Sequence, residues 1–528
     1  MTDRRLSRLL PVERWPTVAQ AQASHWFQPV RLGPVQALSR TWVPAMVPWR
    51  ATGEGQVTPA VLGWYERFAV GQPGVIVVEA TGIRDVPSGP LLRAGHDRFI
   101  EGLSRLTDAV RRASGGHTRL FIQLIDFLAI KRRPPKDKFF AQHLVITDRH
   151  REYFNSVLRT RGHPVRPEPV EGAHPSAGAP GSHFDKLSEL SVNGAVASSG
   201  TQLAGDDQLR AALAAASDET LRQVLTAREF DAYSRGLRER VTDTHLPHIA
   251  ELPRVLPELF AAAARRCEQA GFDGIELHFA HAYTMASFLS ALNDRTDGYG
   301  GTLEHRVRAP LEVFAATRAA VSSRIAVGCR YLADEIIEGG SHVDEAAEYG
   351  VRFARAGFDF ISLSRGGKFE DARQPKVGQA VYPYTGPSGH ECMPTPMISA
   401  PGPWGRNVPA VARVKKAIVD AGFTTPVVAC GGISSFWQAE AILSEGEADI
   451  VASARQSIAD PDWFRKLQLG RGEDIRRCFF TNYCEGLDQS HEVVTCQRWD
   501  RAKGEADDLT VARTADGRRT VAPPWKAG

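Results

Sequence analysis

Two histidines and a tyrosine, His278, His281 and Tyr283, lie close together where an apolar run of the sequence ends. The run from Gly271 to Leu277 is short and rich in β-forming residues, as is typical of a buried strand. Polar side chains at the end of such a strand lie where α/β barrels place their active-site groups. Two imidazole donors beside a phenol suit a reaction in which a carbonyl oxygen gains charge while a neighbouring carbon is protonated.

Two other interpretations of this motif remain open. A histidine at a strand end is often a surface or core imidazole without a chemical role. The His-x-x-His spacing also suggests zinc, but zinc needs further ligands, and no nearby Cys, Asp or Glu has a familiar spacing. The motif alone therefore does not distinguish catalysis from structure, and the elements that position it must be considered.

The composition is that of an ordinary globular protein of 528 residues, with 43% apolar residues and a net charge of +3. So small a charge gives no support for binding to nucleic acid or to an anionic membrane. No apolar run is long enough to cross a bilayer, and no apolar core of a secretory signal follows Arg4-Arg5. Seven scattered cysteines fit reduced thiols better than a disulfide framework. We expect a cytoplasmic protein that acts on a small molecule and binds neither nucleic acid nor membrane.

Eight short apolar runs alternate with stretches of helical periodicity. This alternation predicts a closed parallel (β/α)8 barrel, whose strands are buried on both faces and therefore read as continuous apolar runs. An open doubly wound sheet is the alternative, but no Gly-x-Gly-x-x-Gly follows any run, so a dinucleotide-binding fold has no support. The runs are Trp42–Val47, Val75–Ala80, Leu120–Ile125, Gly274–Phe279, Ile325–Tyr331, Phe358–Ser364, Pro426–Cys430 and Asp449–Ala454.

A long interval interrupts this alternation between the third and fourth runs. We predict an insertion over residues 131–250 that decorates the catalytic face, partly as a lid. Helices are expected over residues 206–216 and 217–241, the second capped by Ser217. The Pro- and Gly-rich middle of the insertion should be disordered.

The remaining domain boundaries follow from the same alternation. Residues 1–25 form an N-terminal extension, and residues 26–130 and 251–468 form the barrel. Residues 469–528 form a polar tail, rich in Gly and Arg, that contains three cysteines. We expect this tail to be poorly ordered from Arg501 onwards.

With these motifs placed, the chain resembles the old yellow enzyme family of FMN-dependent ene-reductases, especially its bacterial NADH:flavin oxidoreductase branch. The resemblance covers residues 26–130 and 246–468. Its most specific part runs from Gly271-Phe-Asp-Gly-Ile-Glu-Leu-His-Phe-Ala-His-Ala-Tyr to Asp297-Gly-Tyr-Gly-Gly-Thr-Leu-Glu-His-Arg. The resemblance implies a TIM barrel that binds FMN and uses NADH or NADPH as reductant.

The resemblance also implies a role for individual residues. His278 and His281 would hold the carbonyl or other electron-withdrawing oxygen of the substrate, and Tyr283 would protonate its α-carbon. Tyr382, in the long loop after the sixth strand, would cap the substrate, although aromatic loop residues equally often only pack. The flavin would be held by Met46, Val47, Ala80, Gln123, Arg330, Gly431, Gly432, Ala454 and Arg455.

Within this set the resemblance separates two ends of the flavin. Gln123 would bind the pyrimidine edge, and Arg330 would lie beside N1 and O2. The phosphate would rest on backbone N–H groups of Gly431, Gly432 and Ala454, with Arg455 as counter-charge. Gly-rich turns after the last two strands are also where barrels commonly bind phosphate, so the residues support the same assignment.

Some positions depart from the family pattern. Val47 stands where a Thr or Cys usually binds flavin O4, and Asp126 replaces a His. Ala454 replaces a Gly, which is tolerable unless its φ is positive. Cys478, Cys484 and Cys496 are spaced like ligands of a [4Fe–4S] cluster in larger relatives. Those relatives have four cysteines, and Thr481 stands at the position of the second. We therefore expect an iron–sulfur remnant rather than an intact cluster.

The function predicted is NAD(P)H-dependent reduction of the activated C=C bond of an α,β-unsaturated carbonyl compound. Within the family, oxidative demethylation, dehydrogenation or dienoyl-thioester reduction is the alternative. A non-catalytic barrel that binds a flavin or another ligand is a third hypothesis. The sequence does not decide whether the protein forms a homo-oligomer.

Overall fold

The fold is given by a computed structural model, which describes most of the chain. The described residues are 14–87, 89–128, 131–161, 205–281, 283–366, 376–378, 380–381, 403–501 and 512–526. The chain divides into two compact units. Unit 1 comprises Met1–Ile130, Glu239–Arg373 and Tyr382–Gly528, and unit 2 comprises Lys131–Arg238 and Gln374–Val381.

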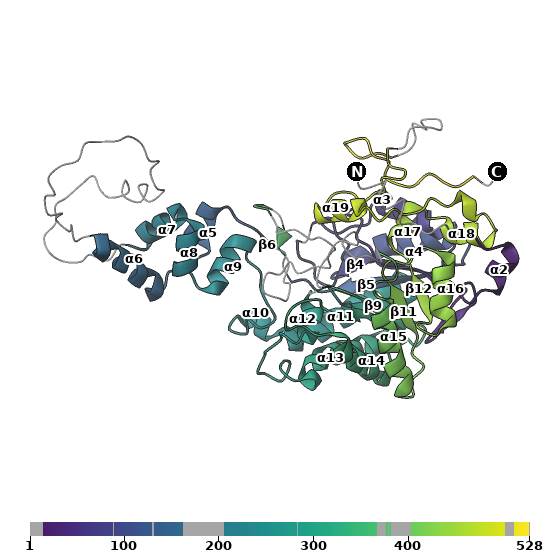
Figure 1. Ribbon diagram of the computed structural model, residues 1–528, viewed down its shortest axis with the longest axis horizontal. Helices are drawn as coiled ribbons and strands as arrows, with labels where there is room; N and C mark the ends of the chain where they lie inside the picture. The colour runs from purple at the N-terminus through teal and green to yellow at the C-terminus, as the bar shows by residue number, and fades with distance from the viewer. Residues whose placement is uncertain are drawn as a thin grey trace, which may run out of the picture. The chain divides into compact units, whose positions relative to one another are not determined.

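Unit 1 contains a closed barrel of parallel strands, which confirms the predicted fold class (Figure 1). Each predicted apolar run overlaps one strand of the barrel. Around the barrel the strands follow the order β11-β12-β3-β4-β5-β7-β8-β9, so the first and last strands of the barrel pair and close it. They are β3 Thr41–Val43, β4 Val75–Gly82, β5 Arg119–Ile125, β7 Gly274–Phe279, β8 Ala326–Leu332, β9 Ile361–Ser364, β11 Val427–Cys430 and β12 Ile450–Ala452.

Amphipathic helices cover the outside of the barrel. Figure 1 shows α11, α13, α14 and α15 side by side on one flank. None of the described helices is long and apolar enough to cross a membrane. The helices between the strands are α3 Pro59–Ala69, α4 Ile100–Ser114, α11 Leu252–Gln269, α13 Leu303–Ala320, α14 Val343–Ala356, α15 Val408–Asp420 and α16 Phe436–Ser444.

The amino end of the barrel is filled by apolar side chains. The rings of Trp42, Phe121 and Phe360 pack with centroid distances of 5.4–5.6 Å. The antiparallel hairpin of β1 (Val30–Leu32) and β2 (Val35–Ala37) adds apolar side chains to the same buried cluster. Because this end is packed, polar side chains of unit 1 can gather in a pocket at the opposite, carboxyl end of the strands.

Unit 2 is a small helical unit with its own apolar cluster, which includes Phe139, Phe140, Leu209 and Leu221. The short strands β6 (Lys131–Arg132) and β10 (Ala380–Val381) pair antiparallel within it. Its helices are α5 Lys136–Gln142, α6 Asp148–Arg161, α7 Asp206–Ala215, α8 Asp218–Val224 and α9 Ala227–Arg235. The Pro- and Gly-rich middle of the predicted insertion lies outside the described residues.

One detail of the predicted insertion is wrong. Ser217 caps α8 as predicted, but the expected helix over 217–241 is two helices, because Thr226 begins α9 with a capping box. The first segment of unit 2 ends at Arg238, whereas the predicted insertion extends to residue 250. Residues 239–250 belong to unit 1, where Arg295 donates to the carbonyl oxygens of Val241 (2.6 Å) and Ile249 (3.1 Å).

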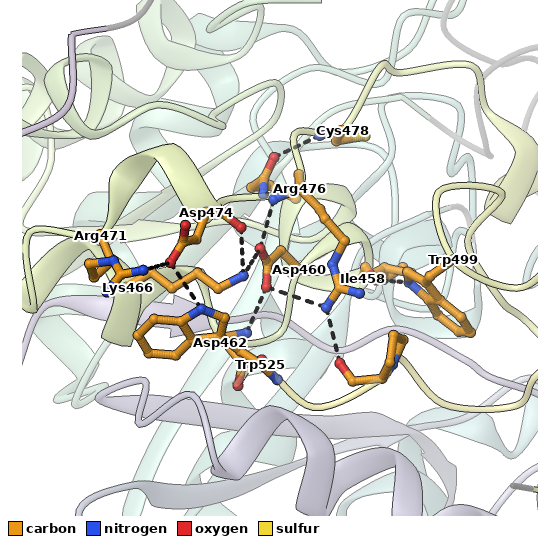
Figure 2. Close-up of polar contacts among 12 residues, drawn as sticks. Ile458, Asp460, Asp462, Lys466, Arg471, Asp474, Arg476, Cys478, Trp499 and Trp525 are labelled. Atoms are coloured by element: carbon orange, nitrogen blue, oxygen red, sulfur yellow. Dashed lines mark hydrogen bonds and ion pairs between the residues drawn. The ribbon is translucent and has the colours of Figure 1, made fainter. Parts of the chain in front are cut away.

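The C-terminal tail is anchored on the barrel by a buried ion pair (Figure 2). Lys466, in α18 (Trp463–Gln468), donates to Asp460 at 2.6 Å, and both side chains are almost fully buried. The backbone N–H of Arg476 donates to the same carboxylate at 2.8 Å. The indole of Trp525 donates to Asp474 at 3.1 Å. The expectation of poor order is therefore wrong for residues 512–526.

A second buried cluster joins the barrel to the tail. The Tyr65 hydroxyl donates to Glu79 at 2.9 Å, and Arg50 donates to the carbonyl oxygens of Val494 (2.8 Å) and Thr520 (2.5 Å). Burial raises the pKa of Glu79 to about 8 and lowers the pKa of Arg50 to about 10. Glu79 therefore keeps its proton at neutral pH, whereas the same carboxyl is ionised in the unfolded chain.

We expect the wild-type protein to lose stability relative to the Glu79→Gln variant as pH rises from about 4.5 to about 8. In this window the folded carboxyl holds a proton that the unfolded one releases, so the free energy of unfolding falls by at most about 1.4 kcal/mol per pH unit. Denaturant titrations at several pH values measure the difference. Glu101→Gln, at an exposed position of α4, is the control. A difference that does not change with pH would contradict the assignment.

Candidate active site

A pocket lies at the carboxyl ends of the barrel strands. Strands from all around the barrel contribute to it: Ala80, Gln123, His278 and Arg330 come from four neighbouring strands, and Ser364, Cys430 and Ala452 come from β9, β11 and β12. Tyr382 lies outside the described residues. The other residues predicted to contact substrate or flavin all line this pocket: Met46, Val47, Ala80, Gln123, His278, His281, Tyr283, Arg330, Gly431, Gly432, Ala454 and Arg455.

The two histidines and the tyrosine form one aromatic group at the end of β7. The His278 ring lies 5.7 Å from the His281 ring and 5.5 Å from the Tyr283 ring, measured between centroids. His281 has a φ of 57°, which turns the chain directly after the strand. Tyr283 begins the short helix α12 (Thr284–Leu289) and also contacts the ring of Phe127.

The hydrogen bonds of the two imidazoles indicate which nitrogen carries the proton. His278 Nδ1 accepts from the backbone N–H of Ala280 at 3.4 Å, so a neutral ring carries its proton on Nε2. Arg330 donates to Ser364 Oγ at 3.2 Å, and His281 Nε2, 3.1 Å from the same oxygen, is an acceptor when the serine O–H turns towards it. The His281 proton then lies on Nδ1, which is buried and has no hydrogen-bond partner. Each ring therefore offers one N–H donor.

Both imidazoles are neutral at physiological pH. Burial lowers the pKa of His278 well below its ordinary value, and the neighbouring His281 and Arg330 lower it further. Burial and the charge of Arg330 lower the pKa of His281 to about 3. A neutral N–H donor can polarise a carbonyl oxygen without exchanging a proton with it.

Buried Gln123 and Glu276 and half-buried Arg330 form a polar group inside the barrel. Gln123 Nε2 donates to Glu276 Oε1 at 2.6 Å, and the two residues are paired in register on β5 and β7. Burial raises the pKa of Glu276, whereas the nearby Arg330 lowers it. Arg330 also donates to Cys430 Sγ at 3.3 Å, but its Nη1 is buried and has no partner. An unsatisfied guanidinium nitrogen at a pocket wall is what an acceptor edge of a bound flavin would satisfy.

The turn after β11 has the shape of a phosphate cradle. Gly431 and Gly432 have φ values of 118° and 71°. A Cβ at Gly432 would lie 1.6 Å from the carbonyl oxygen of Pro403, so no side chain fits there. Ala454 has a φ of −84°, and the substitution for glycine at this position is therefore not strained. The residues present fit a flavin phosphate at this end of the pocket.

Arg455, the expected counter-charge, is held by the tail. Its Nη1 donates to Asn482 Oδ1 at 2.7 Å, and its guanidinium lies 4.7 Å from the centre of the Phe480 ring. Glu485 lies 3.9 Å from it. These residues come from the segment around α19 (Tyr483–Gln489), which supplies one wall of the pocket.

The departures from the family pattern have different outcomes. Val47 lines the pocket with an apolar side chain. Asp126 is buried and forms an ion pair with Arg84 at 2.5 Å, so it serves the third loop rather than the pocket. Cys484 lines the pocket, and burial raises the pKa of all three tail thiols. Among the described residues, no group of three or more His, Cys, Asp or Glu could hold a metal ion.

Sequence reasoning missed several residues of the pocket. Ser364 and Arg365 could have been found, because they are polar residues at the end of the sixth strand of the barrel. The others follow no strand end and have no periodicity that would mark them. They are Arg406 and Asn407 before α15, and Phe480, Glu485 and Asp488 in the tail.

Comparisons with known proteins agree with this geometry. The family model described as "NADH:flavin oxidoreductase / NADH oxidase family" matches residues 254–386 and 402–474. An NADH oxidase of Thermoanaerobacter brockii is 34% identical over 44% of this chain and 32% of its own length. A "Multifunctional alkene reductase/demethylase OYE" of Caballeronia cordobensis is 29% identical over 46% of this chain and 32% of its own length. The chain thus spans about a third of these relatives.

Solved structures show the same fold at low sequence identity. A 2-naphthoyl-CoA reductase superposes with a TM-score of 0.58 and 20% identity, over 90% of this chain and 56% of that one. A histamine dehydrogenase from Rhizobium sp. 4-9 superposes with a TM-score of 0.55 and 23% identity, over 90% and 52%. The motifs around β7, the closed barrel and the family model agree: over residues 254–386 and 402–474, less than half of its length, this chain is similar to the NADH:flavin oxidoreductase / NADH oxidase family.

Proposed function

We propose that this protein is an FMN-dependent oxidoreductase that uses NADH or NADPH to reduce the activated C=C bond of an α,β-unsaturated carbonyl compound. The observation that carries the proposal is the presence of two neutral imidazole donors and a phenol in a pocket that also fits a flavin. Similarity to a family of NADH:flavin oxidoreductases supports the flavin and the reductant.

The substrate oxygen would be held by His278 Nε2–H and His281 Nδ1–H. Both donors are aligned before the reaction by the Ala280 backbone and by Ser364, so little reorganisation is needed as the oxygen gains charge. Their neutrality matters, because a cationic imidazole could lose its proton to the developing enolate. The hydroxyl of Tyr283 would supply the proton to the α-carbon.

At the cofactor end, Gln123 and Arg330 would bind the pyrimidine edge of FMN, with Met46, Val47 and Ala80 along the ring. Gly431, Gly432 and Ala454 would bind its phosphate through backbone N–H groups, with Arg455 as counter-charge. Bound FMN would accept hydride from NAD(P)H and return it to the alkene, so that NAD(P)+ and the saturated carbonyl compound are released.

Oxidative removal of an N-methyl group is the second candidate. It is favoured by the names of two relatives, an N,N-dimethylglycine/sarcosine dehydrogenase and a probable N-methylproline demethylase, which are 31% and 30% identical to this chain. Anaerobic bleaching of the flavin by an N-methyl amino acid would favour this candidate. Bleaching by NAD(P)H, followed by recovery of colour with 2-cyclohexenone or maleimide, would favour alkene reduction.

We expect the purified protein, after reconstitution, to have the absorbance bands of FMN and to lose them on Gly432→Ala substitution. The added Cβ would displace the turn from Pro403 and weaken FMN binding by about tenfold or more. Gly446→Ala is a matched control, because Gly446 has the same φ of 71° but no atom within 4 Å of an added Cβ. A colourless wild-type protein would contradict the proposed function. Equal losses of FMN absorbance in both variants would contradict the assignment of the Gly431–Gly432 turn to phosphate binding.

Tyr283→Phe should separate the two half-reactions. We expect reoxidation of the reduced flavin by the alkene to slow by about a hundredfold or more, because the proton donor is lost. Flavin reduction by NAD(P)H should change by less than about threefold. Stopped-flow absorbance measures both rates. Tyr299→Phe, whose hydroxyl contacts Glu312 outside the pocket, is the control. An equal loss of both rates would show that Tyr283 is not the proton donor.

Binding of a neutral enone should be independent of pH between about pH 5 and pH 8. The pKa of His281 is about 3 and the pKa of His278 is well below its ordinary value, so neither ring gains a proton in this range. Dissociation constants from the perturbed flavin spectrum test this. A loss of affinity with an apparent pKa near 6.5 would mean that at least one imidazole titrates normally.

A further inference from the structure

Four guanidinium groups line the pocket, more than the proposed cofactor accounts for. They belong to Arg330, Arg365, Arg406 and Arg455. Arg330 and Arg455 are assigned to the two ends of FMN. A pocket for a neutral enone would need no further positive charge, because burial of a charged group is costly without a partner.

Arg365 lies at the histidine end of the pocket. It directly follows Ser364, whose hydroxyl is 3.1 Å from His281 Nε2. Ser364, which aligns the proposed donor His281, is therefore the chain neighbour of Arg365. Because β9 stands between β8 and β11, and Arg365 also donates to the carbonyl oxygen of Arg406 near the turn after β11, this charge borders both the histidines and the phosphate cradle.

The guanidinium of Arg365 is held in a fixed orientation. Its Nη2 donates to Asp334 Oδ2 at 3.1 Å and its Nη1 donates to the carbonyl oxygen of Arg406 at 3.2 Å, while its Nε is buried without a partner. The other oxygen of Asp334, Oδ1, lies 2.9 Å from His342 Nδ1. The guanidinium has five N–H donors, so its contact with Asp334 leaves others that can bind a second anion.

Asp334 pairs with Arg365 but does not line the pocket, and the carboxylates that do line it lie elsewhere. Glu485 is 3.9 Å from Arg455, and Asp488 accepts from the indole of Trp49 at 2.6 Å. His278 and His281 are neutral. At the substrate end, positive charge is thus supplied by guanidinium groups alone among the described lining residues.

We propose that the substrate of this pocket carries a carboxylate and that Arg365 binds it, which makes the substrate an α,β-unsaturated oxo acid rather than a neutral enone. This inference rests on the proposed alkene reduction. His278 and His281 hold the carbonyl oxygen, and Arg365 holds the acid group and fixes which way round the alkene lies. Arg365 is a specificity-determining residue, and it takes no part in proton or hydride transfer.

The test compares (E)-6-oxohept-4-enoate, whose carboxylate is separated from the enone by two methylene groups, with its methyl ester, which has the same activated alkene without the charge. The wild-type protein should reduce the acid with a kcat/KM about tenfold or more above that of the ester. Arg365→Gln should lower kcat/KM for the acid by about ten- to a hundredfold, mainly through KM, and change that for the ester by less than about twofold. Arg365→Lys should restore part of the preference. Arg324→Gln, at an exposed position outside the pocket, removes the same charge and should change nothing.

Several results would overturn the inference. One is a wild-type kcat/KM that is higher for the ester than for the acid. Another is an equal loss of kcat/KM for acid and ester in Arg365→Gln. A third is a weakened affinity for NAD(P)H with an unchanged preference for the acid, which would assign Arg365 to the dinucleotide phosphates. Dissociation constants of both compounds, measured from the flavin spectrum, need no turnover. If neither compound is reduced but the acid binds tightly through Arg365, the proposed reaction fails while the carboxylate site stands.

Discussion

The charge of Arg330, enclosed at the carboxyl end of the barrel, is the constraint on which the rest of the site depends. A guanidinium cannot release its proton, so every group around it must adapt. It lowers the pKa of His278 and His281, offsets the cost of burying Glu276, and donates to Ser364 and Cys430. Burial and one fixed cation thus keep both imidazoles neutral.

Neutral and charged hydrogen-bond donors of the site suit different parts of the ligands. In the proposed function, neutral N–H groups would face the substrate oxygen, and permanent cations would face the flavin and the acid group. Arg330 and Arg455 suit the pyrimidine edge and phosphate of a flavin, and Arg365 suits a carboxylate. A donor that could titrate near neutral pH would disturb this division, and burial removes that possibility for both histidines.

The sequence predicts the barrel and most of its pocket because both follow simple periodic rules. Strands buried on two faces read as apolar runs, and their carboxyl ends share one rim, so the positions of His278, Gln123 and Arg330 in the sequence suffice to place them together. The tail could not be predicted. Its order depends on single contacts, such as Arg50 with two carbonyl groups and Trp525 with Asp474, and such contacts leave no pattern in a polar segment. The end of the insertion is equally hard to predict, because no change in composition marks the boundary at Arg238.

The pairing of β6 with β10 has a consequence for synthesis of the chain. The two strands of this ribbon are separated by three strands of the barrel, β7, β8 and β9, and by the helices between them. When the chain leaves the ribosome, the helices of unit 2 emerge first but cannot be joined by their second strand until residue 381 has followed. Until then the smaller unit lacks one edge of its ribbon, although most of its residues have already been made. Unit 2 can therefore be completed only after β7, β8 and β9 of unit 1 have been synthesised.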